Sequence, residues 1–319
     1  MSKQILLTGA AGFVGHHVLR YFLENTSYGI VCLVRLNNAG NLRNIAFAAN
    51  EDRVKFIYHD LKFIIHDVLR EEIGPIDYIL HLGANSHVDR SVINPREFFE
   101  DNIMGTVNLL DFMRLHHPQA RLINFSTDEV YGPAPQEHKF KEFERFRPSN
   151  PYSASKAAQI EAGYSYFTTF GLDIISTFTM NIFGPNQHPE KLIPKAMRYA
   201  KKRKEMPVFA ELHDNKLVGV GSRHWLHVSN IGPALDLLLR RGIKGEYYNI
   251  GGTEEFTNEE VVLHINKILG TKPLIKFVDF HKCRPGHDRR YALDSTKFAQ
   301  LGFVPITNFY DGLLDVIKI

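Results

Sequence analysis

Short apolar runs alternate with amphipathic segments along the first half of the chain. Each run is rich in branched residues and ends in glycine or polar residues, as buried strands do. The segments between the runs place apolar residues on one face at helical spacing. This alternation predicts a doubly wound parallel sheet with helices between successive strands. The expected strands are 4–8, 29–35, 54–61, 77–82, 122–125 and 172–179, and the expected helices are 16–25, 64–73, 102–115 and 151–168.

The pattern changes after residue 180, where a run of turn residues marks the departure from the sheet. Ser229 is the expected N-cap of one later helix, and Thr257 caps another with Glu260 completing a capping box. No internal repeat or low-complexity linker separates the two patterns. The later helices are expected at 193–202, 229–239 and 258–269, and the later strands at 224–228 and 246–250.

The predicted fold class is α/β, with a Rossmann-type doubly wound parallel sheet and a smaller, interdigitated C-terminal α/β substrate domain. Residues 1–180 and 222–243 are expected to form the dinucleotide-binding domain. Residues 181–221 and 244–319 are expected to form the substrate domain. The two domains are therefore expected to share the chain in alternating pieces.

Composition excludes several classes of protein. The 319 residues are 44% hydrophobic and 23% charged, with a formal net charge of +3. This is ordinary for a globular protein, and no long Lys/Arg run argues for nucleic acid. Cys32 and Cys283 lie far apart without metal-ligand spacing, which favours a reducing compartment and no metal. No signal peptide and no apolar run long enough to cross a membrane is present, so we expect a soluble cytoplasmic protein.

A glycine-rich turn and a helix follow the first strand directly. Gly9 permits the tight turn, Gly12 lets the backbone approach a pyrophosphate, and Gly15 allows close packing of helix and strand. Phe13 and Val14 lie at the start of the helix, whose amide groups and positive dipole end suit phosphate groups. The order of strand, glycine turn and helix predicts a dinucleotide cofactor.

The end of the second strand bears on the choice between NAD and NADP. An acidic residue there accepts hydrogen bonds from the ribose hydroxyls, whereas a basic residue suits a 2′-phosphate. Val34 occupies this position and Arg35 follows. Because a guanidinium attracts a phosphate, NADP is favoured over NAD. In the alternative interpretation, Arg35 merely stacks on the adenine.

Two further strand ends are expected to line the same cofactor. Asp60, followed by Leu61, ends the third strand and suits an acceptor for the adenine amino group. The alternative is an ordinary turn carboxylate. The fourth strand ends at Leu82, and the small residues Gly83 and Ala84 let a cofactor lie close.

Paired carboxylates follow the fifth strand, in Ser126-Thr127-Asp128-Glu129. Ligands bind at this end of the strands in an open parallel sheet, and paired carboxylates divide acid and base work when their pKa values are separated. The alternative is a solvated strand end. Tyr152 and Lys156 share a face of the helix that Pro151 begins. An ammonium near a phenol lowers the pKa of the phenol, so these two residues are expected to be catalytic.

These features together resemble the extended short-chain dehydrogenase/reductases, and among them the nucleoside-diphosphate-glucose 4,6-dehydratases of the dTDP-glucose type. The resemblance implies an NAD(P)-dependent hydro-lyase of deoxysugar and rhamnose biosynthesis, which converts dTDP- or UDP-glucose to the 4-keto-6-deoxy-glucose derivative and water. The cofactor is then tightly bound and regenerated in each turnover. The matching motifs are Gly9-x-x-Gly12-x-x-Gly15, 86–91, 126–132, Tyr152-x-x-x-Lys156, Asn181 with Phe183-Gly184-Pro185, 189–194 and 284–291.

The resemblance also implies a role for each catalytic residue. Tyr152, held by Lys156, takes the proton of the C4 hydroxyl, and Thr127 hydrogen-bonds the same hydroxyl. Glu129 removes the C5 proton, and protonated Asp128 donates to the departing C6 hydroxyl before the hydride returns to C6. Adjacent residues of a strand point to opposite sides, so both carboxyls reach one pocket only if a turn begins at Asp128.

Substrate contacts are implied after the fourth strand and in the C-terminal half of the chain. The basic loop 284–291 also suits a diphosphate by its own composition, the alternative being a solvated loop. Pro207 and Phe209 are expected near the base. The other implied contacts are Ser86, His87, Asp89, Arg90, Asn181, Lys191, Leu192, Arg223, Asn258, Arg284 and His287.

The chain departs from the family pattern at several places. The acid expected after the second strand is missing, His224 precedes Trp225 in place of an acid, and Cys283 precedes Arg284 in place of another. The segment between Phe209 and Arg223 is longer than usual. The choice between dTDP and UDP therefore stays open.

Two other functions are compatible with such a fold. A nucleotide-sugar 4-epimerase shares the glycine turn and the Tyr/Lys pair but has no need for Asp128 and Glu129. A non-catalytic nucleotide-sensing protein is free to lose Tyr152 or Lys156, and both are present. The resemblance further implies a homodimer through helices near 102–115 and 151–168.

Overall fold

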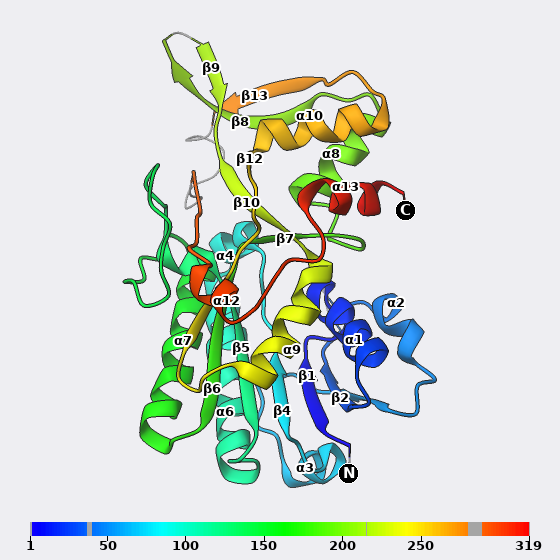
Figure 1. Ribbon diagram of the computed structural model, residues 1–319, viewed down its shortest axis with the longest axis vertical. Coiled ribbons are helices and arrows are strands. Elements are labelled where there is room, and N and C mark those ends of the chain that lie inside the picture. The colour runs from blue at the N-terminus through cyan, green and yellow to red at the C-terminus, as the bar shows by residue number, and fades with distance from the viewer. Residues whose placement is uncertain (1, 37–39, 215, 280–288, 319) are drawn as a thin grey trace.

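The structure is a computed structural model that describes residues 2–36, 40–214, 216–279 and 289–318. A seven-stranded sheet with helices on both faces forms the larger part of the molecule. The smaller part lies beyond the carboxyl ends of these strands, and the N-terminus lies at the opposite end (Figure 1).

Neighbouring strands of the large sheet all run parallel. Their order is β11-β6-β5-β4-β1-β2-β3, which confirms the predicted doubly wound sheet. The order reverses between β1 and β4, and ligands of such sheets bind outside the carboxyl ends at that point. The strands are β1 (Gln4–Thr8), β2 (Gly29–Val34), β3 (Val54–Tyr58), β4 (Tyr78–His81), β5 (Arg121–Thr127), β6 (Asp173–Thr179) and β11 (Tyr247–Ile250).

Each face of the large sheet has its own hydrophobic core, because successive strand residues point to opposite sides. Ile5 and Leu7 of β1 belong to one core, and Leu6 belongs to the other. The helices over the first core are α1 (Phe13–Asn25), α9 (Ile231–Arg241) and α12 (Thr296–Gln300). The helices over the second core are α3 (Asp67–Ile73), α6 (Gly105–His116) and α7 (Pro151–Phe170).

Short helical segments fill several connections of this domain. One of them, η2, is a π-helical turn that leads directly into α6. Such turns are frequent at functional sites. The segments are α2 (Leu42–Ile45), η1 (Ala46–Ala48), α4 (Val88–Ile93), α5 (Pro95–Phe99), η2 (Glu100–Met104), η3 (Asp128–Tyr131) and η4 (Val228–Asn230).

The smaller part contains two three-stranded sheets, ordered β12-β10-β7 and β13-β8-β9. Phe183, Trp225 and Phe309 pack together in its hydrophobic core. Its strands are β7 (Asn181–Phe183), β8 (Met206–His213), β9 (Lys216–Gly219), β10 (Ser222–His227), β12 (Glu255–Thr257) and β13 (Ile275–Asp279). Its helices are α8 (Leu192–Lys201), α10 (Asn258–Leu269) and α13 (Phe309–Ile317).

Two strands lie outside the domains that the sequence assigns to them. The substrate domain expected at 244–319 includes β11, but β11 pairs with β6 at the edge of the large sheet. The dinucleotide-binding domain expected at 222–243 includes β10, but β10 pairs with β7 and β12 in the smaller part. Both differences arise because strand pairing joins distant segments, which local patterns do not reveal.

Helix caps were predicted at two positions, with different outcomes. Thr257 caps α10 as expected, since its Oγ1 accepts from Glu260 N at 3.1 Å and Glu260 Oε2 accepts from Thr257 N at 2.7 Å. The cap predicted at Ser229 is wrong, because Ser229 lies within η4. Asn230 directly precedes α9 and makes no side-chain capping bond.

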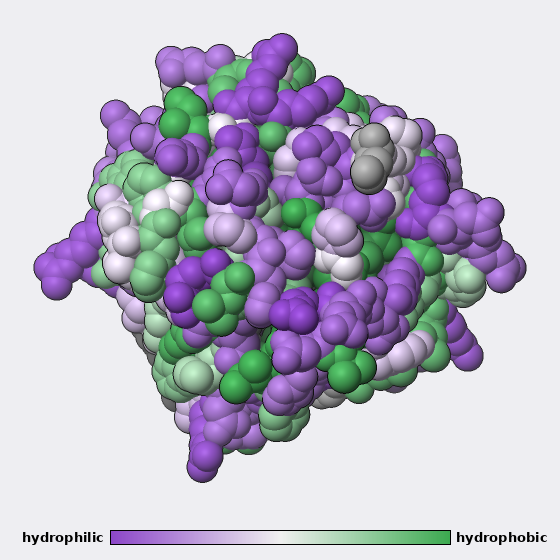
Figure 2. All heavy atoms as spheres, turned by 90° about the horizontal axis from the view of Figure 1, so that it is seen from below, coloured by the Kyte–Doolittle hydropathy of each residue, from purple (hydrophilic) through white to green (hydrophobic). Residues whose placement is uncertain are grey.

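Figure 2 shows the molecule from the side of the amino ends of the large sheet. Hydrophilic side chains cover most of this face, and hydrophobic ones are scattered among them. The predicted functional residues lie at the other end of the sheet, where the strands finish. Among the helices that the structure describes, none has the length and apolar character needed to span a membrane.

Candidate active site

The glycine turn after β1 packs against the loop after β4. Gly9 has a φ of +75°, and a Cβ on it would lie 2.8 Å from Gly83 N. A Cβ on Gly15 would overlap the carbonyl oxygen of Gly9. The backbone requirement for glycine is therefore confirmed at Gly9 and Gly15, since an L residue is strained or overlaps there.

The first turn of α1 fits the phosphates of a dinucleotide. Gly12 is the N-cap and makes no side-chain capping bond, and no acidic residue lies in the first turn. The amide groups at Phe13 and Val14 begin the helix, where backbone donors lack intrahelical partners. Together with the helix dipole, these donors suit a pyrophosphate.

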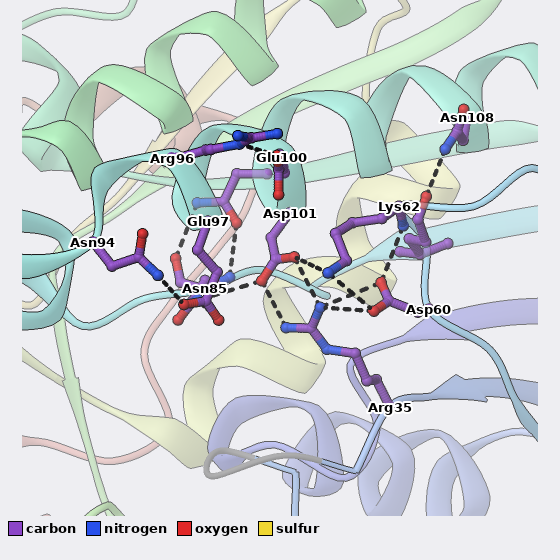
Figure 3. A network of polar contacts seen from close by, with 12 residues as sticks. Arg35, Asp60, Lys62, Asn85, Asn94, Arg96, Glu97, Glu100, Asp101 and Asn108 are labelled. Carbon is purple, nitrogen blue, oxygen red and sulfur yellow. Dashed lines mark hydrogen bonds and ion pairs between the residues drawn. The ribbon is translucent and has the colours of Figure 1, made fainter.

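Arg35 extends from the end of β2 into a cluster of carboxylates (Figure 3). Its guanidinium donates two hydrogen bonds to Asp101, at 2.8 and 2.7 Å, and lies 3.2 Å from both oxygens of Asp60. Lys62 Nζ lies 3.6 Å from Asp60 and 3.9 Å from Asp101. NADP was favoured because Arg35 was expected to be available to a phosphate, but Arg35 is paired with Asp101 and Asp60 instead. Asp101 belongs to no sequence motif, so its contact with Arg35 could not be predicted from the sequence.

A continuous set of buried hydrogen bonds fixes the loop after β4. Thr106 Oγ1 donates to Asn102 O at 2.6 Å and so accepts from His81 Nε2 at 2.9 Å. His81 Nδ1 then accepts from Thr8 Oγ1 at 2.9 Å, and Thr8 Oγ1 accepts from Gly83 N at 2.9 Å. Burial lowers the pKa of His81 to about 3, which keeps the imidazole neutral for these roles. The backbone at Gly83 is thereby held beside the glycine turn.

The other predicted cofactor residues surround the same edge of the sheet. Asp60 and Leu61 follow β3, while Leu82, Gly83 and Ala84 follow β4. Leu61 packs against Gly105 at the start of α6, and its carbonyl oxygen accepts from Asn108 at 2.8 Å. Adenine contact by Asp60 stays a prediction.

The turn that both carboxyls require is present at the end of β5. β5 ends at Thr127, and the short helix η3 begins at Asp128. Thr127 Oγ1 accepts from Glu129 N at 3.4 Å and donates to Asp128 Oδ1 at 3.0 Å. The chain therefore leaves the strand geometry, in which adjacent side chains diverge, at the residue that the sequence indicates.

Asp128 has the environment of a protonated carboxyl. Its side chain is buried, and burial followed by the negative charge of Glu129 raises its pKa to about 7. Its Oδ2 has no hydrogen-bond partner among the described residues, and the same holds for Ser126 Oγ and His87 Nδ1. Buried polar atoms nearly always have partners, so these three atoms suit contacts with a bound ligand.

Glu129 is less buried than Asp128 and lies between two donors. Its Oε2 accepts from Tyr291 OH at 3.4 Å and from Asn150 Nδ2 at 3.5 Å. Asn150 also caps α7, where its side chain accepts from Ser153 N at 2.9 Å. The acceptor carboxylate is therefore tied to the start of the helix that carries Tyr152.

Tyr152 lies in the first turn of α7, which begins at Pro151 as predicted. It is buried and hydrogen-bonds Thr127. Burial, and then the negative charge of Glu129, raise the pKa of Tyr152 above its usual range. The net shift is therefore opposite in direction to the lowering that Lys156 was expected to cause. The reason is that the two carboxyls and the apolar surroundings dominate.

Lys156 points its ammonium at two carbonyl oxygens. Nζ donates to Phe125 O at 2.7 Å and to Gln159 Oε1 at 2.6 Å. Burial lowers the pKa of Lys156 to about 7. Gln159 and its partner Asn124 were not found from the sequence, although the position of Gln159 one turn after Lys156 is a signal that helical spacing offers.

The predicted substrate residues lie on both parts of the molecule. His87 Nε2 lies 2.7 Å from Glu190 Oε2. This contact joins the loop before α4 to the segment before α8. Arg223 lies 4.4 Å from the ring centre of Tyr291, the residue that contacts Glu129. Arg284 and His287, together with Cys283, lie outside the described residues. The elements carry the others as follows: Ser86 and His87 before α4, Asp89 and Arg90 in α4, Asn181 in β7, Lys191 and Leu192 at the start of α8, Pro207 and Phe209 in β8, Arg223 in β10 and Asn258 in α10.

Comparisons with known proteins agree with this geometry. Residues 6–316 match the model of a family described as GDP-mannose 4,6 dehydratase. The low-salt glycan biosynthesis protein Agl12 of Haloferax volcanii is 38% identical over 310 residues, covering 97% of this chain and 96% of the relative. The dTDP-glucose 4,6-dehydratase of Neisseria meningitidis is 36% identical over 336 residues, covering 99% and 92%.

The crystal structure of DesIV, a dTDP-glucose 4,6-dehydratase from Streptomyces venezuelae with NAD bound, has a TM-score of 0.89. It is 34% identical in sequence and covers 99% of this chain and 96% of its own. The parallel sheet, the glycine turn and the Tyr/Lys helix thus define an extended short-chain dehydrogenase/reductase that uses a nicotinamide dinucleotide. The chain belongs to the GDP-mannose 4,6-dehydratase family and is a nucleotide-sugar 4,6-dehydratase.

Proposed function

We propose that the chain converts dTDP-glucose or UDP-glucose to the 4-keto-6-deoxy-glucose derivative and water. The observation that carries this proposal is the turn at Asp128, where a buried carboxyl with a pKa of about 7 adjoins a second carboxyl. Elimination of water needs such an acid beside a base, whereas epimerisation at C4 does not. The similarity of this chain to the dTDP-glucose 4,6-dehydratases of Neisseria meningitidis and Streptomyces venezuelae favours dTDP as the nucleotide of its substrate.

The first step is oxidation at C4, because the proton at C5 becomes acidic only beside a ketone. Tyr152 acts as the phenolate, which the positive charges of Lys156 and of a bound NAD⁺ would favour, and receives the proton of the C4 hydroxyl while Thr127, its hydrogen-bond partner, orients that hydroxyl. Lys156 supplies a positive charge one helical turn away from Tyr152. When bound, NAD⁺ supplies the hydride acceptor and a positive charge, and the same hydride later saturates C6.

The second step is loss of water across C5 and C6. Glu129 removes the C5 proton, and its Tyr291 and Asn150 partners hold the carboxylate in place. Asp128 gives its proton to the C6 hydroxyl, so the C6–O bond breaks and water leaves. With NAD bound, the hydride would return to C6 while Glu129 gives its proton back to C5, which would restore the cofactor and yield the 4-keto-6-deoxy sugar.

NAD is the cofactor that we propose, in place of the NADP favoured by the sequence. The Streptomyces venezuelae structure contains NAD. In this chain, Arg35 is paired with two carboxylates, so a 2′-phosphate meets negative charge as well as the guanidinium. The α1 terminus, Gly83 and Ser126 are the proposed contacts for the rest of the dinucleotide.

A homodimer and a division into two domains complete the proposal. The large sheet with its helices holds the dinucleotide, and β7, β10, β12 and the β8–β9–β13 sheet with α8, α10 and α13 hold the nucleotide sugar. Large apolar side chains are exposed on or beside α6 and α7, which supports pairing of these helices between two copies. They are Met104, Leu115, Tyr164 and Phe170.

Product analysis tests the function directly. The protein is incubated with NAD⁺ and either dTDP-glucose or UDP-glucose, and the masses of the products are measured by mass spectrometry. A product lighter by one water supports the dehydratase, and the faster substrate identifies the nucleotide. A product of unchanged mass that is the C4 epimer contradicts it.

A further inference from the structure

The cluster around Arg35 lies where the adenosine ribose of a dinucleotide is expected. Arg35 follows β2, Asp60 follows β3, and Asp101 lies in the π-helical turn η2 before α6. Figure 3 shows the guanidinium facing both carboxylates, with Lys62 beside them. β2 ends in Val34, so the acid that usually accepts from the ribose hydroxyls is missing from its usual position.

Asp101 holds the guanidinium more firmly than Asp60 does. Both oxygens of Asp101 accept from separate nitrogens of Arg35, at 2.8 and 2.7 Å, whereas one nitrogen is shared between the Asp60 oxygens at 3.2 Å. The Asp101 side chain is only 4% exposed, against 28% for Arg35. Bidentate ion pairs of this kind are the strongest contacts between a guanidinium and a carboxylate, and burial reduces the screening of their charges by water.

The charges of this cluster cancel before any cofactor enters. Arg35 and Lys62 contribute two positive charges, and Asp60 and Asp101 contribute two negative ones. A 2′-phosphate would have to displace Asp101 from Arg35 and then lie beside two carboxylates. A neutral 2′-hydroxyl, by contrast, donates a hydrogen bond to a carboxylate that has lone pairs to spare.

We propose that Asp101 is the residue that selects NAD over NADP in this chain. It does so by holding the Arg35 guanidinium and by adding its own negative charge to the ribose end of the site. Arg35 is then part of a cluster without net charge and no longer attracts a phosphate group. The inference rests on the proposed use of a nicotinamide dinucleotide, and it names the residue that determines which one.

The backbone around Asp101 is fixed by contacts independent of Arg35. The next residue, Asn102, accepts from Asn85 N at 2.7 Å and donates to Asn85 O at 3.0 Å. Asn102 also donates to Ser155 Oγ at 2.8 Å, on the helix of Tyr152. A change of the Asp101 side chain therefore leaves η2 anchored to the cofactor loop and to α7.

The test compares the affinities of Asp101→Asn for NADP⁺ and NAD⁺ with those of the unchanged chain. Asparagine keeps the size of the side chain and removes its charge. We expect the ratio of NADP⁺ to NAD⁺ affinity to rise by about tenfold or more, because the guanidinium then keeps only the weaker Asp60 contact and can pair with the 2′-phosphate. Isothermal titration of each nucleotide into cofactor-free protein gives the ratio without any sugar substrate.

Glu97→Gln is the matched control. Glu97 accepts from Asn85 and Asn94 in the same cluster, at 3.4 and 3.0 Å, and is not a partner of Arg35 within the described residues. Its neutralisation removes one negative charge nearby, yet the affinity ratio is expected to stay within about twofold. A rise as large as that of Asp101→Asn would overturn the assignment to Asp101.

The double variant Arg35→Ala/Asp101→Asn tests the route of the effect. If the gain in NADP⁺ affinity runs through Arg35, the double variant loses it. A retained gain, or an unchanged ratio in Asp101→Asn, overturns the proposal. Asp101→Ser is the second variant should Asp101→Asn fold poorly, with the same rise expected. Because only nucleotide binding is measured, a failure here is separate from a failure to dehydrate the sugar.

Discussion

The ammonium of Lys156 donates a hydrogen bond to the side-chain carbonyl of Gln159 at a distance of 2.6 Å. Gln159 is itself held from two sides by Asn124, which accepts from its side chain and donates to its backbone carbonyl at 3.2 Å. All three residues are buried. Gln159 therefore positions the ammonium of Lys156, the proposed catalytic lysine, and helps to stabilise its charge.

Replacement of Gln159 by Leu is expected to shift the pH dependence of turnover. The pKa of Lys156 is already lowered to about 7 by burial, and loss of an acceptor lowers it further. Activity that needs the ammonium is lost as pH rises through this pKa. The alkaline limb of kcat should therefore move to lower pH by about one unit, with little change in KM for the sugar.

Gln159→Glu is the companion variant, since a carboxylate stabilises the ammonium and moves the same limb to higher pH. Profiles of kcat against pH for the three proteins supply the comparison. Coincident alkaline limbs would show that Gln159 only fills space beside Lys156.

Asp128 is the proposed catalytic acid, and the same buried carboxyl makes the stability of the folded chain depend on pH. Its pKa in the folded chain is about 7, above the ordinary value of 3.8, so between these pH values the folded chain binds more protons than the unfolded one. The contribution of Asp128 to the free energy of unfolding therefore falls as pH rises from about 4 to about 7 and stays low above that.

Asp128→Asn removes the buried charge and should raise the free energy of unfolding at pH 8 by about 1–4 kcal/mol, with a smaller change at pH 5. The same substitution should lower kcat for dehydration by about 100-fold or more, because the proton donor to the C6 hydroxyl is lost. Urea unfolding at both pH values, beside turnover assays, measures the two effects. An equally active variant would remove Asp128 from the mechanism.

Glu129→Gln should separate oxidation from elimination. Without the base for the C5 proton, substrate is oxidised at C4 but not dehydrated, so reduced nicotinamide accumulates on the protein while product formation falls by about 100-fold or more. Absorbance of reduced nicotinamide after mixing with substrate monitors this. Loss of NAD binding in the variant would instead place Glu129 in the cofactor site.

Tyr152→Phe should block oxidation at C4, the step before elimination. The Tyr152 phenolate is the proposed acceptor for the C4 hydroxyl proton, so the variant is expected to bind NAD and sugar yet form no reduced nicotinamide on mixing. The Thr127 hydrogen bond is lost, but the aromatic ring remains packed against Phe98. Near-normal turnover would mean that another group takes the C4 proton.

Local patterns predicted most of the large sheet because each strand, turn and helix of its first half is encoded by neighbouring residues. The glycine turn and the capping box at Thr257 are of this kind. β11 was assigned to the wrong domain because its pairing with β6 depends on a register across some 70 residues of intervening chain. Ser229 failed as a cap because the 3-10 turn η4 takes up that position.

The proposed catalytic pair could be identified from the sequence because Tyr152 and Lys156 stand one helical turn apart. The residues that support it could not. Asp101 reaches Arg35 from 66 residues away, and Gln159 reaches Asn124 from 35 residues away. Their roles follow from three-dimensional contacts and burial, which also set the pKa of Asp128 and reverse the direction expected for Tyr152.

The most direct measurement follows a single hydrogen through the reaction. Substrate carrying deuterium at C4 is converted with NAD⁺ in ordinary water, and the product is examined by mass spectrometry and NMR. Return of the stored hydride to C6 predicts a product that is lighter by one water and carries the deuterium at C6. Deuterium that stays at or returns to C4, in a sugar that keeps its oxygen at C6, would contradict the dehydratase mechanism.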